Sequence, residues 1–231
     1  LFAEVQPIGK PGHINCWQYN QDAVWKNIGP VLQDSTHHSY PFVIRDNNGK
    51  IYMIPESSQA KEIGLWEFGD FPLGLEKVKT IMKGVFFDSN IIYHNDVYYL
   101  FTTTGKSELL IFFAENLLSD SWIPHPSNPI TGNMLYARNG GGVVMHNGKL
   151  IRIAQDCTGQ YGGGILILNI LRLDKNNFEE RKQSINASPY AQLLGIVLEE
   201  LSYGYARATL TVKREHYGWH GGLHGGLIIS L

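Results

Sequence analysis

Three short polar segments carry the residue types that bind or process a polar ligand. Each one comes directly before an apolar run of β-strand character. If the three strands surround one axis, their leading ends bring His, Asp, Arg and Asn side chains to one rim, as a polar ligand requires. We therefore predict a binding site there, to which Asp88 adds a candidate catalytic carboxylate. The residues are His37, His38, Tyr40, Asp88, Arg138 and Asn139.

A second set of polar residues lies at the end of the next strand in each repeat. Glu4, Glu56 and Gln155-Asp156 occupy matching positions, where the third repeat carries Thr102-Thr103. Carboxylates so placed suit acid–base chemistry or the binding of sugar hydroxyls. The alternative is that they bond to backbone groups and hold neighbouring repeats together. We predict catalytic roles for Glu56 and Asp156, beside Asp88, and binding roles for Glu4 and Gln155.

Asp88 stands ahead of an apolar strand, where an acidic side chain is costly unless it is solvated or paired. Arg138 is the partner we expect for it. The alternative for Asp88 is a structural cap or turn.

The C-terminal histidines His216, His220 and His224 are four residues apart, which on a helix would align them for a metal. The many glycines around them disfavour a helix. We therefore predict no metal site and a loop that offers His224 to the ligand. The sequence requires no cofactor, although a cation in the channel stays open. Four aromatic residues could stack on a sugar ring: Tyr40, Tyr136, Tyr161 and Trp219.

The elements that would position these residues come from a fourfold repeat. A short apolar strand, a gap and a second apolar strand recur about 50 residues apart, the period of a four-stranded propeller blade. The repeats begin with Leu1-Phe2-Ala3-Glu4, Met53-Ile54-Pro55-Glu56, Leu100-Phe101-Thr102-Thr103 and Arg152-Ile153-Ala154-Gln155.

Hairpin turns precede three of these phrases. Asp46-Asn47-Asn48-Gly49, Asn95-Asp96 and Asn147-Gly148 separate apolar runs and tolerate positive φ. The first blade begins at its second strand, and residues 188–231 hold further strand-like pieces. We predict an all-β, five-bladed propeller over residues 1–231, a single domain. The two termini would close the ring, since open edges are a liability. The missing inner strand comes from the C-terminus or preceded Leu1.

Composition narrows the functional class. The chain has 231 residues and a net charge of −2, so no overall field recruits nucleic acid or an anionic membrane. No apolar run approaches the roughly 18 residues that span a bilayer. The opening Leu1 suggests a processed or trimmed form. Cys16 and Cys157 fit two buried thiols, with a disulfide left open.

Several motifs in order resemble the propeller domain that precedes the glycosyltransferase domain of plant glucosamine inositolphosphorylceramide transferases. Bacterial relatives carry a similar domain alone or beside sugar formyltransferases. The resemblance covers roughly residues 1–185. The motifs are His37-His38-Ser39-Tyr40-Pro41, Met53-Ile54-Pro55-Glu56, Phe87-Asp88-Ser89, Ala137-Arg138-Asn139-Gly140-Gly141 and Ala154-Gln155-Asp156-Cys157.

That domain is in turn similar to the five-bladed propellers of arabinanases, β-xylosidases and fructan hydrolases. The likeness implies three catalytic acids in such hydrolases, and Asp88 matches the one on the third blade. The first-blade Asp would precede Leu1, and the fourth-blade position reads Arg138-Asn139-Gly140 instead of Glu. Ordinary hydrolysis, which needs two carboxyl groups flanking the bond, is thereby put in doubt.

We expect a propeller of the glycosidase type that binds or cleaves a carbohydrate at its channel. The alternative is a non-catalytic glycan-recognition module associated with a glycosyltransferase domain or subunit. A purely structural interaction propeller is the third reading.

Overall fold

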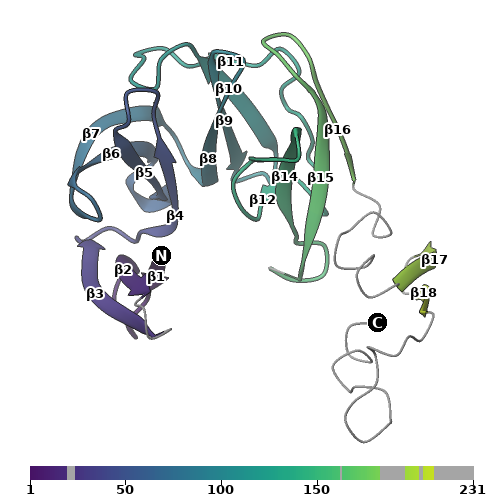
Figure 1. Cartoon of the computed structure of the whole chain (residues 1–231), viewed down its shortest axis with the longest axis horizontal. Helices are drawn as coiled ribbons and strands as arrows, with labels where there is room; N and C mark the ends of the chain where they lie inside the picture. Colours follow the sequence, from purple (N-terminus) through teal and green to yellow (C-terminus); the bar gives the residue numbers. More distant parts are fainter. Residues whose placement is uncertain (20–23, 162, 183–195, 203–204, 211–231) are drawn as a thin grey trace, which may run out of the picture. The chain divides into compact units, whose positions relative to one another are not determined.

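The computed structural model describes residues 1–19, 24–161, 163–182, 196–202 and 205–210. The chain divides into two compact units, Leu1–Arg181 and Lys182–Leu231. The first unit holds four antiparallel sheets that follow one another in chain order (Figure 1).

We call these sheets blades one to four. Blade one has three strands: β1 (Phe2–Val5), β2 (His13–Tyr19) and β3 (Trp25–Leu32). Blade two consists of β4 (Ser39–Arg45), β5 (Ile51–Glu56), β6 (Glu62–Asp70) and β7 (Leu73–Lys83), with the short 3-10 helix η1 (Ser58–Ala60) after β5. Blade three consists of β8 (Phe86–His94), β9 (Val97–Thr104), β10 (Leu109–Ala114) and β11 (Ile123–Pro124). Blade four consists of β12 (Arg138–Asn139), β13 (Val144–His146), β14 (Lys149–Asp156), β15 (Gly164–Leu173) and β16 (Phe178–Lys182).

The turns form where the sequence predicts them. Asn95 and Asp96 have φ of 50° and 62°, and Asn147 and Gly148 have φ of 49° and 72°. Two successive left-handed residues are the signature of the hairpin turn whose twist matches that of the flanking strands. These local turns set the register of the inner hairpins in blades three and four.

Apolar layers between the blades form the core. One layer joins blade two, through Tyr52 and Leu65, to blade three, through Leu100 and Trp122. A second layer joins Phe101 and Ile111 of blade three to Ala137, Val143 and Leu150 of blade four. Stacked sheets with side chains between them are what a propeller requires. The predicted all-β propeller with repeated four-stranded units is confirmed over blades two to four.

An ion pair is built into the fourth blade. The Arg152 side chain is fully buried, and its Nε and Nη2 donate to the two Glu180 carboxylate oxygens, each over 2.8 Å. Nη2 also donates to the Tyr136 carbonyl, and Nη1 to the Asn139 side chain. Arg152 therefore ties β14 to β16 and to the segment that leads into the candidate site.

The second unit contributes one described hairpin, β17 (Ile196–Ser202) paired with β18 (Tyr205–Leu210). Both strands overlap segments expected to form the fifth blade. A further strand-like piece of that segment, Leu227-Ile228-Ile229, lies outside the described residues, as does His224. The fifth blade, ring closure and single-domain extent remain predictions.

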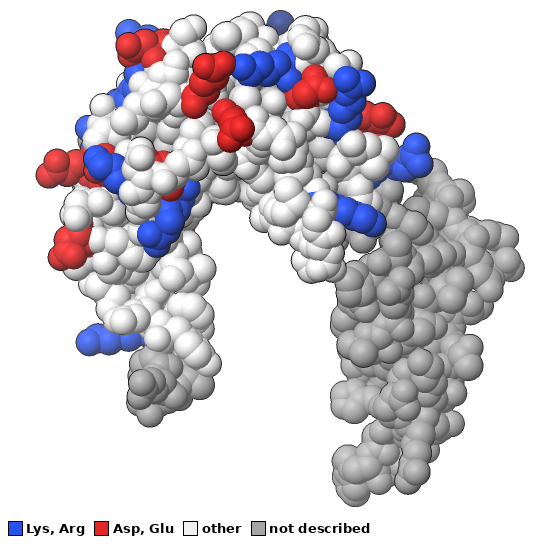
Figure 2. Space-filling view, turned by 45° about the horizontal axis from the view of Figure 1, so that its top comes forward, with Lys and Arg blue, Asp and Glu red and all other residues white. Residues whose placement is uncertain are grey.

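Three expectations drawn from composition can be compared with the structure. Figure 2 shows Lys and Arg side chains interspersed with Asp and Glu on the visible face of the described part. Within the described ranges, no helix is long and apolar enough to cross a membrane. Cys16 and Cys157 are free thiols, the first buried and the second partly exposed.

Candidate functional site

Two of the three polar segments begin their strands with a bulge. The register advances by one extra residue between Ser39 and Phe42 on β4, and again between Phe87 and Asn90 on β8. Tyr40 and Asp88 take the corresponding positions with φ of 42° and 49°. Left-handed backbone at a residue other than glycine is uncommon, and such strain clusters at functional sites. Both bulges lie at the beginning of the first strand of their blade, β4 in blade two and β8 in blade three.

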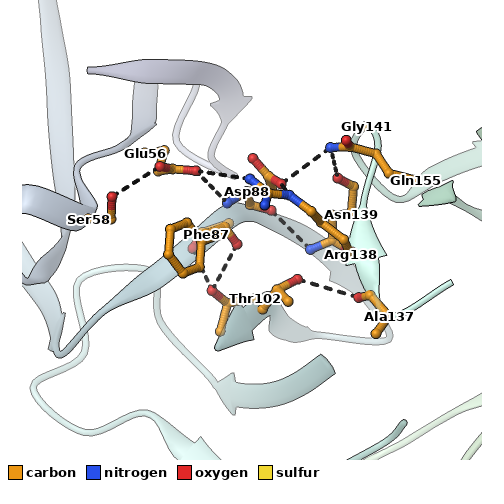
Figure 3. Close-up of polar contacts among 12 residues, drawn as sticks. Glu56, Ser58, Phe87, Asp88, Thr102, Ala137, Arg138, Asn139, Gly141 and Gln155 are labelled. Atoms are coloured by element: carbon orange, nitrogen blue, oxygen red, sulfur yellow. Dashed lines mark hydrogen bonds and ion pairs between the residues drawn. The ribbon is translucent and has the colours of Figure 1, made fainter. Parts of the chain in front are cut away.

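Asp88 and Arg138 form the ion pair that the sequence predicts. Arg138 Nε donates to Asp88 Oδ2 over 2.5 Å, and the Asp88 side chain is only 4% exposed (Figure 3). The Arg138 guanidinium also lies 4.8 Å from the centre of the Tyr161 ring and 5.3 Å from that of Phe87. Cation–π contacts and a charged hydrogen bond fix the guanidinium on several sides.

Gln155 and Asn139 complete the polar surroundings of Asp88. Gln155 Nε2 donates to Asp88 Oδ2 over 3.3 Å and to the Asn139 carbonyl over 2.8 Å. Asn139 Nδ2 donates to the Asp88 carbonyl over 2.9 Å, so it holds the bulge from behind. The register pairs Arg138 with Gln155 and Ser39 with Glu56. Gln155, and not Asp156, is thus the blade-four equivalent of Glu56.

Glu56 lies beside Asp88. Its Oε2 accepts a hydrogen bond from the Asp88 backbone N–H over 3.3 Å and lies 3.9 Å from Arg138 Nη2, and its Oε1 accepts one from the Ser58 hydroxyl (Figure 3). Burial, and then the charge of Asp88, raise the pKa of Glu56 to about 7. Near neutral pH this carboxyl is therefore partly protonated.

The neighbours of Glu56 are shifted for the same reasons. Burial raises the pKa of Asp88, and Arg138 offsets part of that rise. Burial and then the Asp88 charge raise the pKa of the Tyr40 hydroxyl. Burial also raises the pKa of the Tyr161 hydroxyl. Several perturbed titratable groups in one place indicate a functional site.

These groups surround a cavity of about 410 Å³, a size that binds small ligands. At its edge His37 Nδ1 accepts the Gly12 N–H over 2.9 Å, and its Nε2 lies 3.4 Å from Glu4 Oε1. The cavity, which we call the rim pocket, is lined by Glu4, Gln6, His37, Ser39, Tyr40, Glu56, Asp88, Arg138, Gln155 and Tyr161.

The structure brings together seven of the predicted site residues: Glu4, His37, Tyr40, Glu56, Asp88, Arg138 and Gln155. Three others do not line the pocket. His38 is buried, with Nδ1 2.8 Å from the Ser57 hydroxyl and Nε2 3.0 Å from Asp34. Asn139 is buried behind Asp88, and the Asp156 carboxylate accepts the backbone and hydroxyl donors of Thr158.

The prediction of site residues missed Gln6 and Ser39, and it named Tyr161 only as an aromatic candidate. Gln6 follows Glu4 by two residues, and alternation along β1 and its extension would place both on one side. Ser39 lay inside a segment already singled out. Tyr161 lies in the loop between β14 and β15, where no alternating strand pattern predicts which way a side chain points. The residue is 72% exposed, which leaves part of the ring open to a ligand.

The donor set of the rim pocket does not resemble a metal centre. Among the described residues, no group of three or more His, Cys, Asp or Glu side chains is placed to hold a metal ion. Arg138 occupies the space beside Asp88 and Glu56. A cation in the channel receives no support from this arrangement.

Solved structures that resemble the chain are carbohydrate-active propellers. A family-43 glycoside hydrolase described as thermostable superposes with a TM-score of 0.59 at 14% identity, over 81% of this chain and 72% of that protein. An α-L-arabinanase from Cellvibrio cellulosa in complex with arabinohexaose gives 0.56 at 17% identity, over 78% and 72%. At such identities the likeness shows the propeller fold alone.

Relatives by sequence are closer. Glucosamine inositolphosphorylceramide transferase 1 of Arabidopsis thaliana is 34% identical over 191 residues, and that of Oryza sativa subsp. japonica is 33% identical over 170. These matches cover 78% and 70% of this chain but only 25% and 23% of the plant proteins. The chain thus spans about a quarter of their length. The profile of the N-terminal domain of glucosamine inositolphosphorylceramide transferase 1 matches residues 1–192, and the chain belongs to this family.

Proposed function

We propose that the rim pocket binds a carbohydrate and that the domain is a glycan-recognition module serving a glycosyltransferase domain or subunit. The observation that carries the proposal is the pocket itself. Hydrogen-bonding side chains from four consecutive blades converge on one cavity beside an exposed Tyr161 ring. Polar groups that fix orientation, together with an aromatic face, are what a sugar requires.

The arrangement favours binding over hydrolysis. A glycosidase places two carboxyl groups on either side of the scissile bond, roughly 5–9.5 Å apart. Here Asp88 and Glu56 contact one guanidinium, at 2.5 and 3.9 Å, and Glu56 accepts the backbone N–H of Asp88. They therefore stand side by side on Arg138 rather than on opposite sides of a sugar bond. Asp156, the other candidate acid, is outside the pocket lining.

Membership of the transferase family supports the association with a sugar-transferring partner. The plant relatives are named for a transferase, and most of their length lies outside the part that this chain matches. We propose that a glycosyltransferase domain or subunit acts with this propeller. We also propose that residues 188–231 supply the fifth blade, as the resemblance to arabinanases implies.

The test is binding and hydrolysis on a glycan array with the 231-residue chain. Tyr161→Ala should weaken the binding of any sugar hit about tenfold, or about 1.4 kcal/mol, with little effect on folding because the ring is exposed. Tyr93→Ala, at an aromatic residue outside the pocket lining, is the matched control and should bind normally.

Hydrolysis is followed on every glycan that binds. Binding without turnover supports a recognition module. Turnover that Asp88→Ala abolishes would replace it with a glycosidase, and failure of all glycans to bind would end the carbohydrate proposal.

A further inference from the structure

A second concave surface lies away from the rim pocket, where the turn after β8 meets the end of β15. Two adjoining cavities of about 390 and 410 Å³ are found there, and both are lined by Arg172 and Leu173. We call the two cavities together the turn groove. It shares no lining residue with the rim pocket, which lies where β8 begins. The turn groove is therefore a separate candidate site.

The floor of the turn groove is apolar. Leu150, Ile170 and Leu173 of blade four line it together with Val97 and Tyr99 of blade three. The same five side chains belong to the buried layer that packs these two blades against each other. Such packing keeps the floor rigid and leaves it suited to apolar side chains of a ligand.

Basic side chains with unused donors line the walls. Among the described residues Lys149 forms no ion pair, and it is exposed. Arg172 donates through Nε to Asp174 Oδ2 over 2.8 Å, which leaves both Nη groups for a ligand. Asn95 Nδ2 donates to His94 Nε2 over 3.1 Å, so the neutral His94 ring carries its proton on Nδ1. The walls therefore offer an ammonium, the end of a guanidinium and an imidazole N–H.

Among the described lining residues Asp174 is the one acid, and its own turn satisfies it. Its Oδ1 accepts the backbone N–H groups of Asn176 and Asn177 over 2.8 and 2.9 Å. The Ser127 N–H donates to His125 Nδ1, so His125 Nε2 donates to the Asp174 carbonyl over 2.9 Å. This bond fixes the turn to blade three, so the wall is in place before a ligand binds.

Unused cationic donors above an apolar floor complement carboxylates carried on an apolar strand. We propose that the turn groove binds an extended acidic peptide segment of a partner protein. Alternate side chains of an extended peptide point to opposite sides. Apolar side chains then contact the floor, and carboxylates contact Lys149 and Arg172. Two cavities side by side accommodate several residues, whereas a single small anion fills only one of them. The proposal does not depend on carbohydrate binding at the rim pocket.

The experiment is fluorescence anisotropy of the 231-residue chain with three labelled peptides of equal length. The first alternates Glu and Leu, and the others carry Gln or Lys in place of Glu. The Glu–Leu peptide should bind about tenfold or more tightly than the Gln–Leu peptide, and the Lys–Leu peptide should bind weakest. Raising the salt from about 0.15 to about 0.5 M should weaken Glu–Leu binding, because exposed charges are screened.

Variants locate the peptide on the surface. Lys149→Glu should lower the affinity for the Glu–Leu peptide about tenfold, and Arg172→Gln should lower it severalfold. Lys106→Glu makes the same charge change at an exposed lysine in the turn between β9 and β10, outside the groove lining. This matched control should bind normally.

Equal binding of the three peptides, or an equal loss in Lys149→Glu and Lys106→Glu, overturns the proposal. Binding of inorganic phosphate that Lys149→Glu abolishes, with no binding of any peptide, would replace the peptide with a small anion. Each of these outcomes leaves the carbohydrate function standing, since the glycan array tests that function separately.

Discussion

At the scale of the residues, the energetic cost of burying a charged side chain in the site is offset by ion pairs and hydrogen bonds. Asp88 is almost completely buried, and its charge is tolerated because Arg138 and Gln155 donate to one of its oxygens. Glu56 lies farther from the Arg138 guanidinium, and burial and then the charge of Asp88 raise its pKa to about 7. Burial beside a second carboxyl group thus leaves Glu56 near its titration point at neutral pH.

Glu56 should make the protein less stable as pH rises. Its pKa is raised from 4.5 to about 7 in the folded chain, so the folded state binds the proton more tightly. The stabilisation is fully present below about pH 4.5 and is lost as pH rises through about 7. Glu56→Gln should therefore stabilise the chain at pH 8, relative to its effect at pH 5, by about 1–3 kcal/mol. Urea unfolding at the two pH values measures this difference.

Glu67→Gln serves as the control, because that carboxylate pairs with Lys50 on the surface. Its effect on unfolding should stay below about 1 kcal/mol. If Glu56→Gln were equally destabilising at pH 5 and pH 8, the buried carboxyl would not hold a proton in the folded chain.

At the scale of the elements, the fourth blade contains a buried ion pair between Arg152 and Glu180. The alternation of apolar and polar residues along its strands does not explain this pair. Leu150, Arg152 and Ala154 share the buried face of β14, and the arginine is completely enclosed there. Glu180 on β16 and the Tyr136 carbonyl satisfy its donors. Through Asn139 the same side chain supports the residue next to Arg138, so the blade's interior positions the rim.

Arg152→Met should destabilise the chain by about 3–5 kcal/mol, because Glu180 would be left as a buried charge without its partner. Adding Glu180→Met should recover much of that loss, since both charges are then removed. Arg152→Lys should recover little, because an ammonium cannot reproduce the planar fork. A double-mutant cycle by urea unfolding measures the coupling, and strictly additive single effects would refute it.

At the scale of the whole molecule, blade four presents apolar side chains on its outer face. Ile165, Ile167 and Leu171 alternate on β15 and are 62%, 42% and 51% exposed. In a closed ring that face is where a fifth blade packs, because each blade of a propeller buries both faces against neighbours.

Ile167→Lys tests ring closure. If a fifth blade covers the face, the buried ammonium should cost about 2–4 kcal/mol. Val78→Lys on the outer strand β7 is a matched control, since Val78 is 46% exposed, and should cost about 0.5 kcal/mol or less. Thermal unfolding of the 231-residue chain compares the two. Equal small effects would mean that the face stays open to solvent.

The repeat, its strands and its hairpin turns were predictable because each depends on neighbours along the chain. Alternating apolar residues and Asn- or Asp-containing turns act within a few positions. These local signals predicted blades two to four and a first blade of three strands. The pairing of Asp88 with Arg138 was predictable too, because matching repeat positions meet at one rim.

Only the tertiary structure decided which polar side chains face the pocket. One extra residue in β4 and in β8 sets the direction of every side chain before it, and pairing across β14 brings Gln155, not Asp156, to the rim. His38 turned inward because Ser57 and Asp34 satisfy both its ring nitrogens. The charge state of Glu56 likewise follows from burial and from Asp88, about 30 positions away. Local sequence sets the strands, whereas contacts between distant segments set the chemistry.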